Sequence, residues 1–253
     1  MNAIPAVRYI DSHCHVFEIK GYSLPNDLVP VVVAYSHESN VKAHRYATEH
    51  GFPFVLGIAP QTSLKGDLRK LDEWIDFIKK AKPNAVGEIG LDYKWATGRE
   101  GIDREMLVFE RMLNLSDELG VPVVINSRNS PTGSLAEDKS FHNDAIDDIL
   151  SMLSGRRFLM HFFSGTSDQA EKIVQMGGYV SVSHMRSKER RKTIERVPLE
   201  RLLVESDAPY VGRTPDTVRD AVAYISEVKA MPLDLVARQT LVNAMDFFDF
   251  TLK

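Results

Sequence analysis

Val29-Pro-Val-Val-Val-Ala-Tyr35 is an almost uninterrupted run of apolar residues, and Val121-Pro-Val-Val-Ile125 repeats the pattern later in the chain. Such runs are typical of parallel strands buried on both faces, because a strand with one solvated face alternates apolar and polar residues. Eight strands are predicted on this basis, and they cover residues 7–15, 29–35, 54–60, 85–91, 122–127, 157–163, 178–183 and 202–207.

Segments with the apolar spacing of helices separate these strands, for example at residues 67–81, 103–119, 143–153, 167–176 and 217–231. An eightfold alternation over 253 residues matches the usual size of a (β/α)8 TIM barrel. A doubly wound open sheet is the alternative α/β fold, because periodicity alone does not show closure. No shift in composition marks a linker, so a single domain is expected over residues 1–253.

The charge and the cysteine content restrict the function further. The formal net charge is −4, whereas a domain that binds duplex DNA by backbone neutralisation alone is usually strongly basic. The segment 186–192 is rich in Lys and Arg, and it is either a local basic rim or a solvated helix start. Cys14 is the single cysteine and cannot form an intrachain disulfide. Neither a leader nor an apolar run of membrane length is evident, so a cytoplasmic protein is expected.

Residues that can bind metal ions stand at the ends of four predicted strands. His13 and His15 end the first strand and share one face, because successive strand side chains alternate. Glu88 lies on the fourth strand, His161 on the sixth and Asp207 at the end of the eighth. The carboxyl ends of barrel strands meet at one mouth, where barrel enzymes carry their chemistry. Each residue alone has a packing explanation, but buried carboxylates are costly unless paired or metal-bound, so the set predicts a metal site.

These residues belong to seven ordered motifs: Tyr9-Ile-Asp-Ser-His-Cys-His15, Gly87-Glu-Ile-Gly-Leu-Asp-Tyr93, Pro122-Val-Val-Ile-Asn-Ser-Arg128, His161-Phe-Phe-Ser-Gly165, Gly178-Tyr-Val-Ser-Val-Ser183, Glu205-Ser-Asp-Ala-Pro209 and Asn243. In this order they resemble the TatD-type metal-dependent hydrolases, a deoxyribonuclease family among the amidohydrolase-like barrels. The resemblance spans almost the whole chain.

The resemblance implies a site for one or two divalent ions, Mg, Mn or Zn. His13, His15 and Asp207 would hold one ion, Glu88 would bridge, and His161 would help to hold a second. It also implies that DNA is the substrate, cleaved at phosphodiester bonds from the 3′ end of single-stranded or damaged strands by a 3′–5′ exodeoxyribonuclease-like activity. No membrane or obligate protein partner is expected.

Three residues are the candidate catalytic groups. Asp207 would accept the proton of the attacking water, Glu88 would support the metal chemistry, and Arg128 would grip a phosphate through its planar fork. Asp11, two residues before His13, is expected in a supporting position where it orients an imidazole or contacts the metal region.

One departure from the family pattern concerns the fifth strand. The family carries His-x-Arg there, whereas this chain carries Asn126-Ser-Arg128. Asparagine offers a carbonyl oxygen but is a weak ligand for Zn and lacks imidazole basicity, so Asn126 is a doubtful ligand of the second ion. His142 and His184 could reach the site instead, although a solvated position explains either one more simply.

Two other functions remain open at this stage. One is a metal-dependent esterase or amidase of the same fold, for example a D-aminoacyl-tRNA deacylase, and the loops at the mouth would decide this. The other is a catalytically impaired member that acts as a binding protein, which Asn126 favours and the otherwise intact ligand set opposes. The long polar loop at residues 127–140 is expected over the mouth, and Trp95 either stacks a base or caps the barrel.

Overall fold

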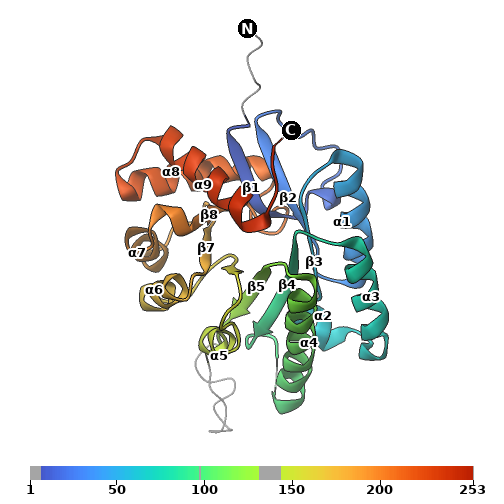
Figure 1. The fold of residues 1–253 in the computed structure, drawn as a ribbon. Helices are drawn as coiled ribbons and strands as arrows, with labels where there is room; N and C mark the ends of the chain where they lie inside the picture. Colours follow the sequence, from blue (N-terminus) through green and yellow to red (C-terminus); the bar gives the residue numbers. More distant parts are fainter. Residues whose placement is uncertain (1–6, 97, 131–143, 253) are drawn as a thin grey trace.

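Eight parallel strands follow one another around the molecule in sequence order, as Figure 1 shows. The computed structural model describes residues 7–96, 98–130 and 144–252. The strands are β1 (Tyr9–Cys14), β2 (Leu28–Val33), β3 (Phe54–Leu56), β4 (Ala85–Asp92), β5 (Val123–Arg128), β6 (Phe158–Met160), β7 (Tyr179–Val182) and β8 (Leu202–Val204).

The two ends of this sheet meet, which makes the fold a barrel rather than an open sheet. The amide of Asp207 donates to the carbonyl of His13 at 3.0 Å, and the amide of His15 donates to the carbonyl of Ala208 at 2.8 Å. These bonds join the ends of β1 and β8. The predicted (β/α)8 TIM barrel is therefore confirmed.

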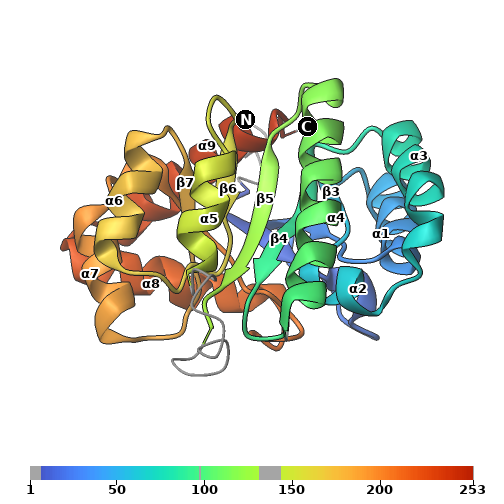
Figure 2. The same ribbon diagram turned by 90° about the horizontal axis from the view of Figure 1, so that it is seen from below.

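Helices surround the strands, with α4 and α5 on either side of β5 in Figure 2. They are α1 (His37–His50), α2 (Pro60–Lys65), α3 (Leu71–Ala81), α4 (Gly98–Leu119), α5 (Ala145–Met152), α6 (Ser167–Gln175), α7 (Lys188–Arg196), α8 (Val218–Lys229) and α9 (Leu233–Phe248). Short 3-10 turns are η1 (Val16–Glu18), η2 (Leu68–Lys70), η3 (Leu199–Arg201) and η4 (Pro215–Thr217).

Local sequence accounts for these helices. Ser36 and Thr166 accept hydrogen bonds from the third amides of α1 and α6 and so begin both helices with capping boxes. In α3, the buried residues Leu71, Trp74 and Ile78 recur at helical spacing and face the barrel. No helix in the described ranges is long and apolar enough to cross a membrane.

The strands are shorter than predicted at the ends that matter for function. β6 stops at Met160 and β8 at Val204, so His161 and Asp207 follow their strands instead of lying within them. Phe162 and Asp207 have φ angles of 46° and 49°. This left-handed conformation is incompatible with a continuing strand, so the chain turns out of the sheet at the mouth, the carboxyl end of the barrel.

Strands β2 and β5 are buried on both faces, as their apolar runs predict. Val31, Val32 and Val33 are fully buried, and Val123 to Ile125 are buried to the same degree. At the other side of the sheet, Asn243 of α9 donates from its side-chain amide to the carbonyls of Leu199 and Leu202, at 2.7 and 2.8 Å. The last helix is thereby tied to β8.

Candidate metal centre and cavity

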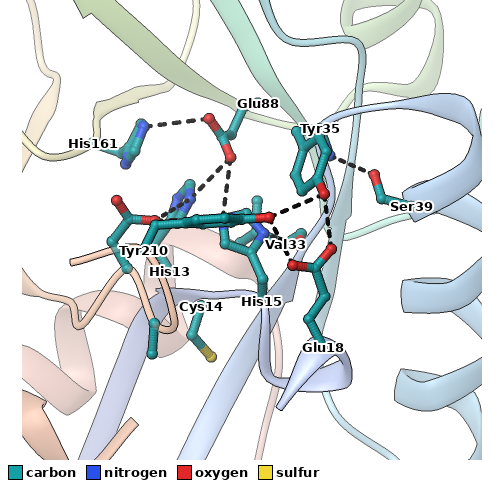
Figure 3. Close-up of polar contacts among 12 residues, drawn as sticks. His13, Cys14, His15, Glu18, Val33, Tyr35, Ser39, Glu88, His161 and Tyr210 are labelled. Carbon is teal, nitrogen blue, oxygen red and sulfur yellow. Dashed lines mark hydrogen bonds and ion pairs between the residues drawn. The ribbon is translucent and has the colours of Figure 1, made fainter. Parts of the chain in front are cut away.

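Four side chains that the sequence places on three different strands converge at the mouth, and Figure 3 shows His13, His15 and Glu88 among them. The Nε2 atoms of His13 and His15 lie 3.3 and 3.5 Å from Oε1 of Glu88. Oδ1 of Asp207 lies 3.4 Å from Nε2 of His15 and 3.9 Å from Nε2 of His13. All four side chains are buried or nearly so, which brings two carboxylates and two imidazoles together away from bulk water.

These distances fit a shared metal ion. Nitrogen and oxygen ligands lie about 2.0–2.2 Å from Zn, and ligands in a tetrahedral arrangement are then separated by roughly 3.4 Å. The four measured separations scatter around that value. The residue types are also suitable, because imidazole and carboxylate together bind Zn, Mn and Fe. The predicted convergence of His13, His15, Glu88 and Asp207 is thus observed as geometry.

His15 is held in the orientation that metal binding requires. Its Nδ1 lies 2.8 Å from the carbonyl oxygen of Val33 and donates to it, so Nε2 faces the carboxylates and is the nitrogen that would bind a metal ion placed between them. Cys14, between the two histidines, points to the opposite side of β1, and its Sγ contacts the carbonyl of Val31 at 3.7 Å. Cys14 is therefore a packing residue.

His161 lies next to this group and extends it. Its ring stacks on that of His13 with centroids 3.9 Å apart, and its Nε2 is 3.5 Å from Oε2 of Glu88. Its Nδ1 lies 3.6 Å from Oε1 of Glu205. Glu205 is in turn fixed by the hydroxyl of Ser181, which donates to Oε2 at 2.6 Å. Glu205 is the first residue of the sequence motif that ends at Pro209, but no role was predicted for it.

The electrostatics of the group favour positive charge. Burial lowers the pKa of His13. Burial also acts to lower the pKa of His161, but Glu205 and Glu88 outweigh it and raise that pKa overall. The pKa of His15 is raised in the same way, by Asp207 and Glu88. The pKa of Glu88 lies well below its usual range, because His13 and His161 outweigh its burial. A field that favours imidazolium favours a metal cation for the same reason.

Asp11 supports the centre through the backbone. Its Oδ1 accepts hydrogen bonds from the amides of Ser206 and His13, at 2.9 and 3.2 Å, and the Ser206 hydroxyl donates to its Oδ2. The carboxylate thus joins β1 to the segment after β8. It contacts the chain around the ligands and no imidazole ring.

A cavity of about 1100 Å³ opens beside the metal centre. Its wall contains His15, Glu88, His161 and Asp207 together with Asn126. The Asn126 side chain makes no hydrogen bond with any residue that the structure describes. His184 does not line this cavity, and His142, like most of the loop expected over the mouth, lies outside the described residues.

Away from the metal centre the cavity wall is cationic. Arg128 is held by Asp92, whose Oδ2 accepts from Nε at 2.8 Å and from Nη2 at 2.5 Å, and Gln61 donates to the same oxygen at 2.7 Å. Arg104 donates to the carbonyls of Ser63 and Gly66 and has no carboxylate partner among the described residues. Lys65 also lines the wall. Sequence reasoning missed Lys65 and Arg104, because nothing in their local pattern marks a site.

The basic segment 186–192 does not form a basic rim of the cavity, which was one of its two sequence-based interpretations. Its residues do not line the cavity. Arg186 pairs with Glu227 at 2.7 Å, Arg191 with Glu195 at 3.0 Å, and Lys192 with Glu189 at 2.8 Å. Much of the positive charge at the start of α7 is therefore compensated by neighbouring acids.

A (β/α)8 barrel with buried histidines and carboxylates at its mouth defines the class of barrel metal-dependent hydrolases. The sequence model of the TatD related DNase family matches residues 10–249, and the chain belongs to this family. By class it is thus a TatD-family metal-dependent hydrolase.

Individual relatives agree with this assignment. The putative deoxyribonuclease tatdn3 of Danio rerio is 29% identical in an alignment that covers 95% of this chain and 97% of the relative. The uncharacterized metal-dependent hydrolase YabD of Bacillus subtilis (strain 168) is 26% identical, with 86% of each chain covered. The crystal structure of YjjV, a TatD homologue from Escherichia coli K12, superimposes with a TM-score of 0.78 at 24% identity, over 97% of this chain and 99% of that one, and so supports the fold.

Proposed function

We propose that this protein is a divalent-metal-dependent deoxyribonuclease that releases nucleotides from the 3′ end of single-stranded or damaged DNA. The observation that supports this most is that His15, Glu88 and Asp207, which converge with the buried His13, line one cavity together with the cation Arg128. Hydrolysis of a phosphodiester needs both the metal ligands and a nearby cation, because the negative charge of the phosphate must be bound while its phosphorus is attacked. The names of relatives such as the Danio rerio deoxyribonuclease point to the same bond.

In this proposal His13, His15, Glu88 and Asp207 hold the divalent ion, and His161 stands beside Glu88 for a second one. A bound ion supplies Lewis acidity at a phosphoryl oxygen and lowers the pKa of a water molecule. Asp207, whose side chain is 13% exposed toward the cavity, accepts the proton from the attacking water. Arg128 binds phosphate with Nη1, the guanidinium nitrogen that Asp92 leaves free.

The test is nucleotide release from 3′-labelled single-stranded DNA in Mg²⁺ and in Mn²⁺. Release by the natural chain is expected, and Asp207→Asn is expected to lower the rate by about a hundredfold or more, because it removes a general base. Asp72→Asn is the matched control, since Asp72 is an exposed residue of α3. A second substrate labelled at the 5′ end establishes the direction.

Three results would argue against the proposal in different ways. Equal rates for the natural chain and Asp207→Asn would exclude the assigned role of Asp207. Release from the 5′ end first would contradict the direction. No release by the natural chain with metal bound would direct attention to ester or amide substrates, and loss of turnover on those as well would favour a binding protein.

A further inference from the structure

Trp95 is a large aromatic ring left in contact with solvent inside the candidate substrate cavity. It is 52% exposed and lines the cavity, whereas Trp74, the other tryptophan of the chain, is 8% exposed and stacks on His37. A ring of this size normally removes most of its apolar area from water. Its exposure within a polar cavity therefore suggests a ligand with a flat face.

The turn that follows β4 fixes the backbone from which the ring projects. The amides of Trp95 and Ala96 donate to the main-chain carbonyl of Asp92 at 3.0 and 2.9 Å, and the amide of Lys94 donates to its Oδ1 at 3.2 Å. Because the Asp92 carboxylate also binds Arg128 and Gln61, one buried residue positions both the turn that carries the ring and the cation beside it.

Positive charge surrounds the ring. Nζ of Lys65 lies 5.8 Å from the ring centroid and Cζ of Arg128 lies 5.9 Å from it. Lys65 is exposed and makes no ion pair with any residue in the described ranges, so it can move to a phosphate. This part of the cavity wall contains the acidic residue Glu100 and the three cations Lys65, Arg104 and Arg128.

A second exposed ring in the cavity has the opposite surroundings. Tyr210 is 58% exposed, but its hydroxyl donates to Glu18 at 2.7 Å, and the hydroxyl of Tyr35 donates to the other oxygen of Glu18 at 2.8 Å. A carboxylate repels a phosphate chain. The Trp95 side is thus the side of the cavity that suits a polyanion with flat bases.

We propose that Trp95 is the platform on which an unpaired base of the DNA strand stacks, with Lys65 and Arg128 binding the phosphates next to that base. This inference rests on the proposed function and specifies it, because a base can stack on Trp95 only when it is not paired. The platform selects single-stranded over duplex ends through stacking, which is insensitive to base identity.

The two tryptophans make a direct test possible. Trp74→Phe leaves Trp95 as the sole tryptophan, and Trp95→Phe leaves Trp74. Each variant is titrated in the presence of metal with a phosphorothioate oligothymidylate, which resists hydrolysis, and with an abasic strand of the same length. Stacking is expected to quench Trp95 fluorescence with the oligothymidylate only, and to leave Trp74 fluorescence unchanged.

Affinity measured by anisotropy of labelled strands provides the second readout. Trp95→Ala is expected to weaken oligothymidylate binding about tenfold or more, from the usual energy of base–aromatic stacking, and to leave the abasic strand unaffected. Trp95→Phe should retain most of the affinity. Equal weakening for both strands would overturn the platform and mean a structural role for Trp95.

The outcome also separates this inference from the proposed function. If the phosphorothioate oligothymidylate binds equally well to the natural chain and to Trp95→Ala, and both proteins hydrolyse the ordinary phosphodiester oligothymidylate at the same rate, the platform is wrong and the nuclease stands. If no strand binds to the natural chain and none is hydrolysed, the proposed function fails and the platform fails with it.

Discussion

At the scale of single residues, we propose that Asn126 limits the number of metal ions that the centre holds. It stands in the cavity wall near the carboxyl end of β5, and its side chain has no hydrogen-bond partner among the residues of known position. The neighbouring His161 is fixed between Glu88 and Glu205. A second ion would thus find His161 and Glu88 in place, but a weak amide oxygen where an imidazole would bind it.

Asn126→His is expected to raise the number of metal ions bound per chain, because it adds an imidazole at the edge of the existing group. The measurement is metal content by mass spectrometry after saturation with Zn²⁺ or Mn²⁺ and removal of free ion. Asn114→His, at an exposed position of α4, controls for a histidine added elsewhere.

His13→Ala should lose most of the bound metal while the circular dichroism spectrum stays that of the barrel. Unchanged metal content in both variants would refute this account of the ligands.

At the scale of elements, the junction of α4 and β4 contains a buried carboxyl group that the proposed chemistry does not use. Oε2 of Glu105 in α4 accepts from the amide of Asp92 at 2.8 Å, and its Oε1 has no partner in the described parts of the chain. Burial raises the pKa of Glu105 from 4.5 to about 8, the amide of Asp92 and the charge of Arg128 oppose this shift, and the charge of Asp92 adds to it. The fold thus favours the neutral form of Glu105.

This shift has a defined consequence for stability. Between pH 4.5 and about pH 8 the unfolded chain releases the Glu105 proton while the folded chain retains it. The unfolded state therefore binds fewer protons, and the contribution of this group to the free energy of unfolding falls as pH rises, by at most about 1.4 kcal/mol per pH unit. Above pH 8 the contribution levels off.

Glu105→Gln removes this titration while keeping a neutral group of the same shape. Denaturant unfolding of both proteins from pH 5 to pH 9 should show the variant gaining stability over the natural chain as pH rises to about 8. The difference between the two proteins is the quantity to follow, because other groups titrate equally in both. A difference that stays constant with pH would show that Glu105 is ionised throughout this range.

At the scale of the whole molecule, the cations of the cavity wall contrast with the negative net charge of the chain. The formal net charge is −4, yet the cavity wall beside the metal centre carries Lys65, Arg104 and Arg128. The cations at the start of α7 are largely compensated by acids. The attraction that these three cavity cations exert on a phosphate chain extends over about the Debye length of 8 Å at physiological salt.

The salt dependence of strand binding measures this local charge. Single-stranded DNA that contacts three cations should give a slope of about −2 for log K against log salt concentration, at about −0.7 per contact. Lys65→Ala should make the slope shallower by about 0.7. Lys70→Ala removes the same charge from an exposed residue that does not line the cavity. If both variants changed the slope equally, net charge and not the cavity wall would govern binding.

The relation between sequence and structure differs among these scales. The burial of β2 and β5 and the convergence of His13, His15, Glu88 and Asp207 were predictable from the sequence. Apolar runs mark buried strands, and the carboxyl ends of parallel strands must meet at one edge. The predicted strands extend beyond the observed ends of β6 and β8, because the left-handed turns at Phe162 and Asp207 leave no signal in apolar periodicity.

The sequence by itself determined the barrel, the candidate metal ligands and the unusual Asn126, since the strands and the motifs that contain these residues can be recognised along the chain. The tertiary structure decided that Glu205 holds His161, that Asp11 joins β1 to Ser206 across 195 residues, and that Trp95 stands among Lys65 and Arg128. Such contacts join distant segments whose relative placement depends on the closure of the barrel and the path of each loop. No local pattern encodes either one.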